Sequence, residues 1–127
     1  MTSRERLLLT LNHKEPDRVP FDLSSTQVTG IAEGAYNNLL QHLGMPVDNI
    51  ELSDVVQQLA QPSDAFLEKM QVDTRGLFPK TSHNWNIEQN LYEEGDYLAF
   101  RDEWGMIHHK PKENGYWFSI ISSPLEN

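Results

Sequence analysis

A run of hydroxyl-bearing residues, Ser24, Ser25 and Thr26, is the clearest set of side chains in this sequence that can bind a ligand. It follows residues 19–23, VPFDL, whose alternating apolar side chains predict a β-strand. In α/β proteins the residues after the C-terminal end of a strand commonly carry the ligand. We therefore predict that Ser24, Ser25 and Thr26 bind substrate; the alternative is that they form an ordinary turn or helix cap.

Arg75 is the other residue predicted to contact substrate. It lies in residues 72–78, VDTRGLF, which we interpret as a second strand, and its guanidinium can meet an anionic group. The alternative is a structural ion pair with Asp73 or Asp22.

Metal and acid–base chemistry have weaker support. His108 and His109 are adjacent in a predicted strand, so their side chains point to opposite faces and cannot chelate one metal ion together. The chain has 0 cysteines, so a zinc site built on thiolates lies outside it. Glu33, beside the hydroxyl run, and Glu103 are the acids whose surroundings suggest more than surface charge. No catalytic residue or metal ligand is predicted in this chain.

Four helices are predicted to position the two strands. The first begins at a capping box formed by Thr2 and Glu5, carries a stripe of leucines, and ends before Pro16. The others are predicted to start at Thr29 or Gly30, at Ser53 and at Ser63, and the second of the four ends at Gly44.

The pattern changes after Pro79. Residues 80–95 are polar and irregular, and three short antiparallel strands are then predicted within 97–121. The turns between them are expected at Asp102–Gly105 and Glu113–Gly115.

Composition limits the classes of function. Hydrophobic residues make up 38% of the 127 residues, and no apolar run approaches the roughly 20 residues of a membrane span. The formal net charge of −9 argues against nucleic-acid binding, because a phosphate backbone is held by Lys and Arg. We expect a cytoplasmic globular protein that binds neither nucleic acid nor membrane.

Several segments together resemble the opening of the uroporphyrinogen decarboxylase superfamily, which includes corrinoid-linked methyltransferases. The resemblance rests on LNHKEPDRVPFDL, TGIAEGAYNNLLQHLG, VVQQLAQPSDAFLEKMQVDTRGLFP and DEWG. It implies a (β/α)8 TIM barrel, a fold that needs about 250 residues.

The resemblance therefore predicts an α/β chain that supplies the N-terminal portion of a barrel with an antiparallel β-hairpin insertion. Residues 1–127 would be a partial domain, with helices and two barrel strands in 1–79 and a loop and the β insertion in 80–127. Whether the chain is an isolated N-terminal piece, a cleaved product or a truncated relative is left open.

The resemblance also bears on the reaction. True decarboxylases of the superfamily carry an arginine-rich R-Q-A-G-R loop after the first strand and an F-S-D motif after the second. This chain has Ser24–Gln27 and Phe78–Lys80 at those places, so decarboxylation is disfavoured.

What the resemblance then implies is a methyltransferase that moves a methyl group between a small-molecule substrate and a separate corrinoid protein. Zinc, with ligands beyond Asn127, would activate the substrate. The alternatives are a uroporphyrinogen decarboxylase-like lyase and a non-catalytic, self-associating fragment. We expect the full-length protein to be an enzyme and a homo-oligomer, and the isolated chain to be inactive.

Overall fold

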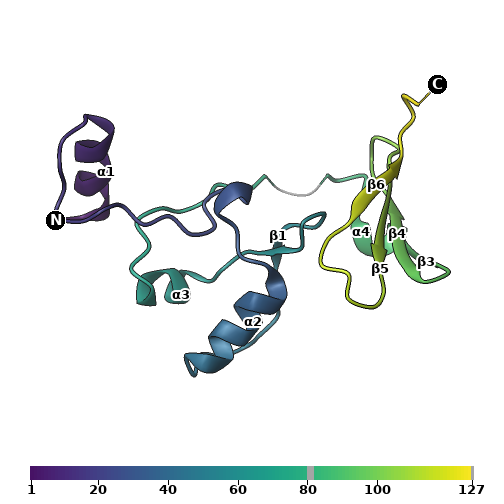
Figure 1. Cartoon of the computed structure of the whole chain (residues 1–127), viewed down its shortest axis with the longest axis horizontal. Coiled ribbons are helices and arrows are strands. Elements are labelled where there is room, and N and C mark those ends of the chain that lie inside the picture. The colour runs from purple at the N-terminus through teal and green to yellow at the C-terminus, as the bar shows by residue number, and fades with distance from the viewer. Residues whose placement is uncertain (80–81, 127) are drawn as a thin grey trace. The chain divides into compact units, whose positions relative to one another are not determined.

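The computed structural model describes residues 1–79 and 82–126, which fall into two compact units. Unit 1 comprises Met1–Ser53 and Leu59–Leu77, and unit 2 comprises Asp54–Gln58 together with the chain from Phe78 onward. Figure 1 shows that unit 1 contains the longer helices and that unit 2 is built on a sheet. None of the helices in the described part of the chain is long and apolar enough to span a bilayer.

Unit 1 has a small apolar core made by two helices and the strands between them. Tyr36 packs edge-on against Phe66, with ring centroids 4.9 Å apart, and Leu40, Ala60 and Val72 are buried in the same cluster. The elements of unit 1 are α1 (Ser3–Leu11), the 3₁₀ helix η1 (Gln27–Thr29), α2 (Glu33–His42), β1 (Leu52–Asp54), β2 (Leu59–Ala60) and α3 (Asp64–Lys69), with the last residue of β1 lying in unit 2.

Local capping signals account for the starts of α1 and α3. The predicted start of α2 at Thr29 or Gly30 is wrong, because this helix begins at Glu33 and its N-cap Ala32 makes no side-chain hydrogen bond. The backbone N–H of Glu5 donates to the Thr2 hydroxyl, and the Thr2 N–H donates to the Glu5 carboxylate, which confirms the predicted capping box of α1. Ser63 caps α3 by accepting a hydrogen bond from the Phe66 N–H, also as predicted. The end of α2 is confirmed as well, because Gly44 follows it with a φ of 63°.

The prediction of a partial (β/α)8 barrel is wrong. The structure has few helices and two small sheets, and neither 19–23 nor 72–78 is a strand. These segments are extended and lie beside each other, but a single backbone hydrogen bond joins them, from the Asp73 N–H to the Phe21 oxygen. The Phe21 N–H donates to the Asp73 side chain rather than to a strand carbonyl, and Pro20 has no N–H to give, so no ladder forms.

The predicted third helix is also wrong, because residues 52–60 form the hairpin of β1 and β2. Ser53, expected to cap a helix, instead donates its hydroxyl to the carbonyls of Leu59 and Ala60. The Asp54 carboxylate accepts the Gln57 N–H, which closes the turn.

The leucine stripe of α1 does not form a core within unit 1. Leu8 and Leu11 are exposed, and the buried residue of this helix is Arg6. The helix also ends at Leu11, several residues before Pro16, because His13 takes a left-handed φ of 55°.

Unit 2 contains a four-stranded antiparallel sheet in the order β3-β4-β5-β6. Its elements are the short helix α4 (Ile87–Asn90), β3 (Leu91–Glu94), β4 (Tyr97–Arg101), β5 (Ile107–Pro111) and β6 (Ser119–Ser122). The buried rings of Phe100 and Phe118 meet edge-on, with centroids 4.9 Å apart. The tip of the β1–β2 hairpin belongs to this unit, since the Phe118 N–H donates to the Val56 oxygen at 2.7 Å.

The antiparallel strands predicted within 97–121 are present, but β3 was not predicted. Residues 80–95 were interpreted as irregular, although Gly95 and Asp96 form a two-residue turn between Glu94 and Tyr97. Gly95 has a φ of 55°, which a hairpin turn of this length commonly requires of glycine. Part of the predicted irregular segment, residues 80–81, lies outside the described residues.

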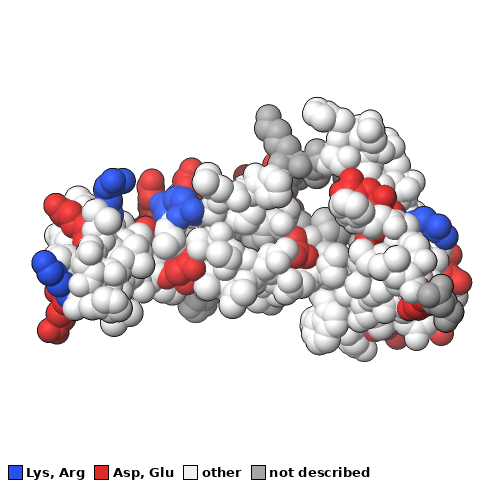
Figure 2. Space-filling view, turned by 90° about the horizontal axis from the view of Figure 1, so that it is seen from above, with Lys and Arg blue, Asp and Glu red and all other residues white. Residues whose placement is uncertain are grey.

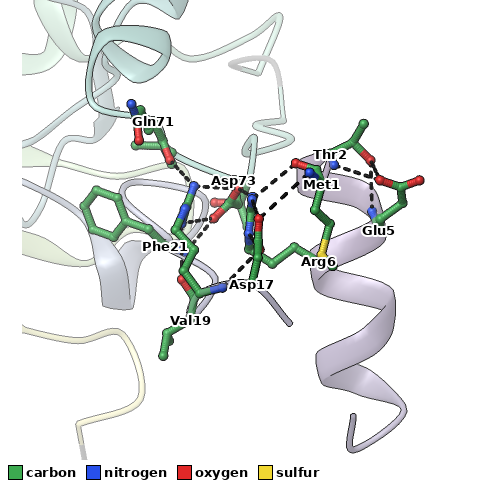
Figure 3. Close-up of polar contacts among 12 residues, drawn as sticks. Met1, Thr2, Glu5, Arg6, Asp17, Val19, Phe21, Gln71 and Asp73 are labelled. Carbon is green, nitrogen blue, oxygen red and sulfur yellow. Dashed lines mark hydrogen bonds and ion pairs between the residues drawn. The ribbon is translucent and has the colours of Figure 1, made fainter. Parts of the chain in front are cut away.

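A buried carboxylate joins the two extended segments of unit 1 to α1 (Figure 3). Asp73, whose side chain is 0% exposed, accepts hydrogen bonds from Arg6 at 2.6 Å and from Arg18 at 2.6 Å and 3.1 Å. Arg6 also makes a two-pronged contact with Asp17, at 2.7 and 2.8 Å. Burial alone would raise the pKa of Asp73, but hydrogen bonds from the Phe21 N–H, Ser3 and both arginines hold it well below its usual range.

Elsewhere the surface carries an excess of acid. On the face of the molecule that Figure 2 shows, acidic side chains are spread widely and few basic ones lie among them, in keeping with the formal net charge of −9.

We predict that Asp73→Asn lowers the free energy of unfolding of unit 1 by about 2 to 3 kcal/mol, because it leaves Arg6 and Arg18 without their shared carboxylate. Urea unfolding followed by far-UV circular dichroism measures this loss, since α1, α2 and α3 all lie in unit 1. Tryptophan fluorescence reports on unit 2 separately, because Trp85, Trp104 and Trp117 all lie there.

The matched control is Asp64→Asn, which breaks an exposed pair with Arg75 in the same unit and should cost less than about 1 kcal/mol. Equal losses for the two variants would contradict the prediction. The pH dependence follows from the lowered pKa of Asp73: the stabilisation is complete above the unfolded-state pKa of about 4 and is lost as the pH falls below it. Between pH 5 and pH 3, wild type should therefore lose more free energy of unfolding than Asp73→Asn, because the variant has no carboxyl group to protonate at this position.

Candidate functional site

The site is a polar loop that follows the extended segment 19–23. Asp73 fixes the end of this segment, and the next residue, Thr74, donates its hydroxyl to Asp22 at the start of the loop. Two stretches of chain that are 52 residues apart are thereby joined side chain to side chain.

Asp22 organises the first half of the loop. Its carboxylate accepts a hydrogen bond from Ser25 at 2.8 Å in addition to the one from Thr74. Burial raises the pKa of Asp22, but the hydroxyls of Thr74, Ser25 and Thr29 more than offset this and hold the pKa below its usual value. Asp22 is therefore an ionised, half-buried carboxylate at neutral pH.

Ser24 is the unusual residue of the loop. It is 5% exposed and has a left-handed φ of 61°, which serine adopts at some conformational cost. Its N–H donates to the Thr29 oxygen at 2.8 Å, which closes the loop on itself. Its hydroxyl, however, is buried and has no hydrogen-bond partner in the described part of the chain. A buried polar group without a partner is uncommon and calls for a physical explanation.

Thr26 lies on the outer side of the same loop. It is exposed, its N–H donates to the Thr29 hydroxyl at 3.4 Å, and the two threonine hydroxyls lie 3.3 Å apart at the start of η1. Thr26 thus forms part of a turn, which is the alternative role considered for it.

Arg75 is not brought to this loop. Its guanidinium pairs with Asp64 at 3.1 Å and donates to the carbonyls of Val72 and Thr74, at 3.1 and 2.8 Å. The partner is thus neither Asp73 nor Asp22, the two acids expected from the sequence. Among the described residues, no hydrogen bond joins Arg75 to Ser24, Ser25 or Thr26.

Sequence reasoning missed three members of the site, Asp22 as an organising carboxylate, Thr29 and Thr74. The spacing Asp22-x-x-Ser25 signals a local turn and could have indicated the first contact. No local signal identifies Thr74. Its position beside Asp22 depends on the contact between the neighbouring Asp73 and Phe21, two residues that are 52 positions apart in the sequence.

The predicted histidine pair has separate partners. His108 contacts Asp102 at 2.9 Å and His109 contacts Glu94 at 2.9 Å, so they do not share a ligand. Within residues 1–79 and 82–126 no three His, Asp or Glu side chains are grouped as a metal ion would require. The residues described here therefore do not fit a zinc site.

Comparison of the chain with protein-family models, with characterised proteins and with solved structures gave no significant match.

We predict that Ser24→Ala and Ser25→Ala change the stability of unit 1 in opposite directions. Ser24→Ala removes a buried hydroxyl that has no partner and should raise the free energy of unfolding by about 1 kcal/mol. Ser25→Ala removes the hydrogen bond to Asp22 and should lower it by about 1 kcal/mol. Urea unfolding followed by circular dichroism measures both; a loss for Ser24→Ala as large as that for Ser25→Ala would mean that the Ser24 hydroxyl has a structural partner.

Proposed function

We propose that this chain belongs to a cytoplasmic methyltransferase, related to the uroporphyrinogen decarboxylase superfamily, that moves a methyl group between a small substrate and a separate corrinoid protein. In this proposal the loop of Asp22 and Ser24–Thr29 contacts the substrate. The chemistry at the reacting bond is left to groups outside the described residues, so the role of this loop is to bind and orient.

The observation that carries the proposal is the buried hydroxyl of Ser24, which has no partner among the described residues and lies two residues after the ionised Asp22. A hydroxyl both donates and accepts, so it can orient a methoxy, amine or thiol compound by one hydrogen bond. Leaving it unsatisfied costs about 1 to 3 kcal/mol of stability, and a bound substrate that supplies the missing partner recovers that cost.

Charge distinguishes the methyltransferase from the decarboxylase alternative. A tetrapyrrole with several carboxylates needs cationic partners, whereas the nearest fixed charge in this loop is the carboxylate of Asp22. Three arginines of unit 1 are already bound to acids, Arg6 to Asp17 and Asp73, Arg18 to Asp73, and Arg75 to Asp64. The loop therefore favours a neutral or cationic substrate over a polyanion.

The test is methyl transfer to cob(I)alamin by the complete natural protein, followed by the spectral change on formation of methylcobalamin. We expect Ser24→Ala to reduce turnover about fivefold, the loss of one neutral hydrogen bond. Ser25→Arg should abolish turnover, because it places a long cation in the loop. Its thermal midpoint should fall no further than that of Ser25→Ala, which loses the same hydrogen bond to Asp22.

Asn38→Arg is the control, since Asn38 is an exposed polar residue on α2 in unit 1, outside the loop. It should retain wild-type activity. Full activity of Ser25→Arg would show that the loop is not part of the substrate site. Decarboxylation of uroporphyrinogen without methyl transfer would favour the decarboxylase alternative.

We also propose that the protein self-associates. β6 is an edge strand of its sheet, and it exposes Ile120 and Ile121, a combination that favours pairing with another strand. Ile120→Lys should reduce association, and Val47→Lys, at an exposed valine of unit 1, should not. Light scattering measures the mass of each; a wild-type chain that remains at 14.7 kDa would contradict the proposal.

A further inference from the structure

Unit 2 contains a cavity of about 320 Å³ beside the β4–β5 turn, a size at the lower end of small-molecule sites. Its walls are largely aromatic and acidic. The lining residues that matter here are Trp85, Phe100, Asp102, Glu103, Trp104 and His108.

His108 is the most buried polar residue of this wall, at 3% exposure. Its Nε2 lies 2.9 Å from Oδ2 of Asp102. The other oxygen of Asp102 accepts the N–H groups of Trp104 and Met106, both at 2.9 Å, so the backbone turn holds the carboxylate in place. Nδ1 of His108 is buried and has no hydrogen-bond partner among the described residues.

The hydrogen-bond pattern assigns the tautomer of His108. Burial raises the pKa of Asp102, but hydrogen bonds from His108 and from the Met106 and Trp104 N–H groups hold it below its usual value, so the carboxylate is ionised. An ionised carboxylate only accepts, and Nε2 must therefore carry the hydrogen. With the hydrogen of the neutral ring on Nε2, Nδ1 is an acceptor, and a donor can satisfy it.

One aromatic ring packs on His108, and two indole rings line the same cavity. Phe100 stacks on His108 with centroids 4.5 Å apart and an interplanar angle of 3°. The ring centroids of Trp85 and Phe100 are 5.9 Å apart. The indole N–H of Trp85 donates to the Arg101 oxygen at 2.9 Å, which fixes the orientation of the indole. Trp104 is 75% exposed, so this ring is accessible from solvent.

The charge at the cavity has one sign. Asp54, Asp102 and Glu103 line it, and no lysine or arginine lies among the described lining residues. Carboxylates together with indole rings attract a cation, by charge and by the negative face of the ring system. An anion would find no counter-charge there.

We propose that this cavity binds a small alkylammonium ion whose N–H donates to Nδ1 of His108. The alkyl groups lie against the rings of Trp85 and Trp104, and the carboxylates of Asp102 and Glu103 balance the charge. The inference is independent of the proposed methyl-transfer function, because every residue that it uses lies in unit 2.

The ligand requirements can be separated with three probes added to the full chain and followed by ¹H–¹⁵N NMR. Trimethylammonium carries one N–H and one positive charge, tetramethylammonium lacks the N–H, and tert-butanol has a donor without the charge. We expect trimethylammonium to shift the indole signals of Trp85 and Trp104 but not that of Trp117, with a dissociation constant on the order of 1 mM. Each of the other two probes should bind at least about fivefold more weakly.

Two matched pairs of variants place the site without disturbing the core. Trp104→Ala should weaken trimethylammonium binding about fivefold, whereas Trp117→Ala, at a ring that is 60% exposed and away from the cavity, should not. Glu103→Gln should weaken binding, and Glu113→Gln, another exposed glutamate of unit 2, should not. All four side chains are exposed, so each variant should keep the dispersed spectrum of the folded chain.

The outcomes decide the proposal. Saturable shifts confined to Trp85 and Trp104, with the stated ligand order and the two variant effects, support it. Absence of saturable binding, equal binding of tetramethylammonium or tert-butanol, or equal effects within either variant pair would overturn it.

Discussion

The contact on which unit 1 depends is the buried carboxylate of Asp73. It accepts hydrogen bonds from the guanidinium groups of Arg6 and Arg18 and from the Phe21 N–H. One side chain thereby joins α1, the segment after α1 and the segment after α3. Taking a carboxylate out of water is costly, and it is tolerated only when charged donors and an N–H replace the lost hydration. Because those donors come from distant positions in the sequence, the carboxylate can be buried only when the segments that carry them are aligned.

The same contact explains why the strand predictions failed. Residues 19–23 have the alternation of a strand, and sequence patterns assume that backbone N–H groups then pair with backbone carbonyls. Here the Phe21 N–H donates to a side chain. In α1, likewise, Arg6 is buried, while Leu8 and Leu11 of the predicted apolar stripe are exposed. Features that depend on neighbouring residues, such as the Thr2 and Ser63 caps, were predictable because their partners are three residues away.

The candidate site likewise combines local features that the sequence predicts with long-range contacts that it does not. The hydroxyl run was visible in the sequence, and so was the possibility that Thr26 forms a turn. The contact of Thr74 with Asp22 was not, because it follows from the alignment imposed by Asp73. The contact of His108 with Asp102 is intermediate: the turn at Asp102–Gly105 was predicted, but only the register of β4 with β5 brings the imidazole back to the carboxylate.

A common feature connects the two sites. In the described part of the chain two buried side-chain polar atoms have no hydrogen-bond partner, Ser24 Oγ and His108 Nδ1. Ser24 lies two residues after the ionised Asp22, and the His108 ring is hydrogen-bonded to the ionised Asp102. Each such atom costs about 1 to 3 kcal/mol, and replacing either by carbon would relieve that cost. Packing therefore gives no reason for either atom, whereas the two proposed ligands would supply the missing partners. In the loop the partner would meet a hydroxyl that can donate or accept, and in the cavity it would meet the Nδ1 acceptor of a neutral imidazole.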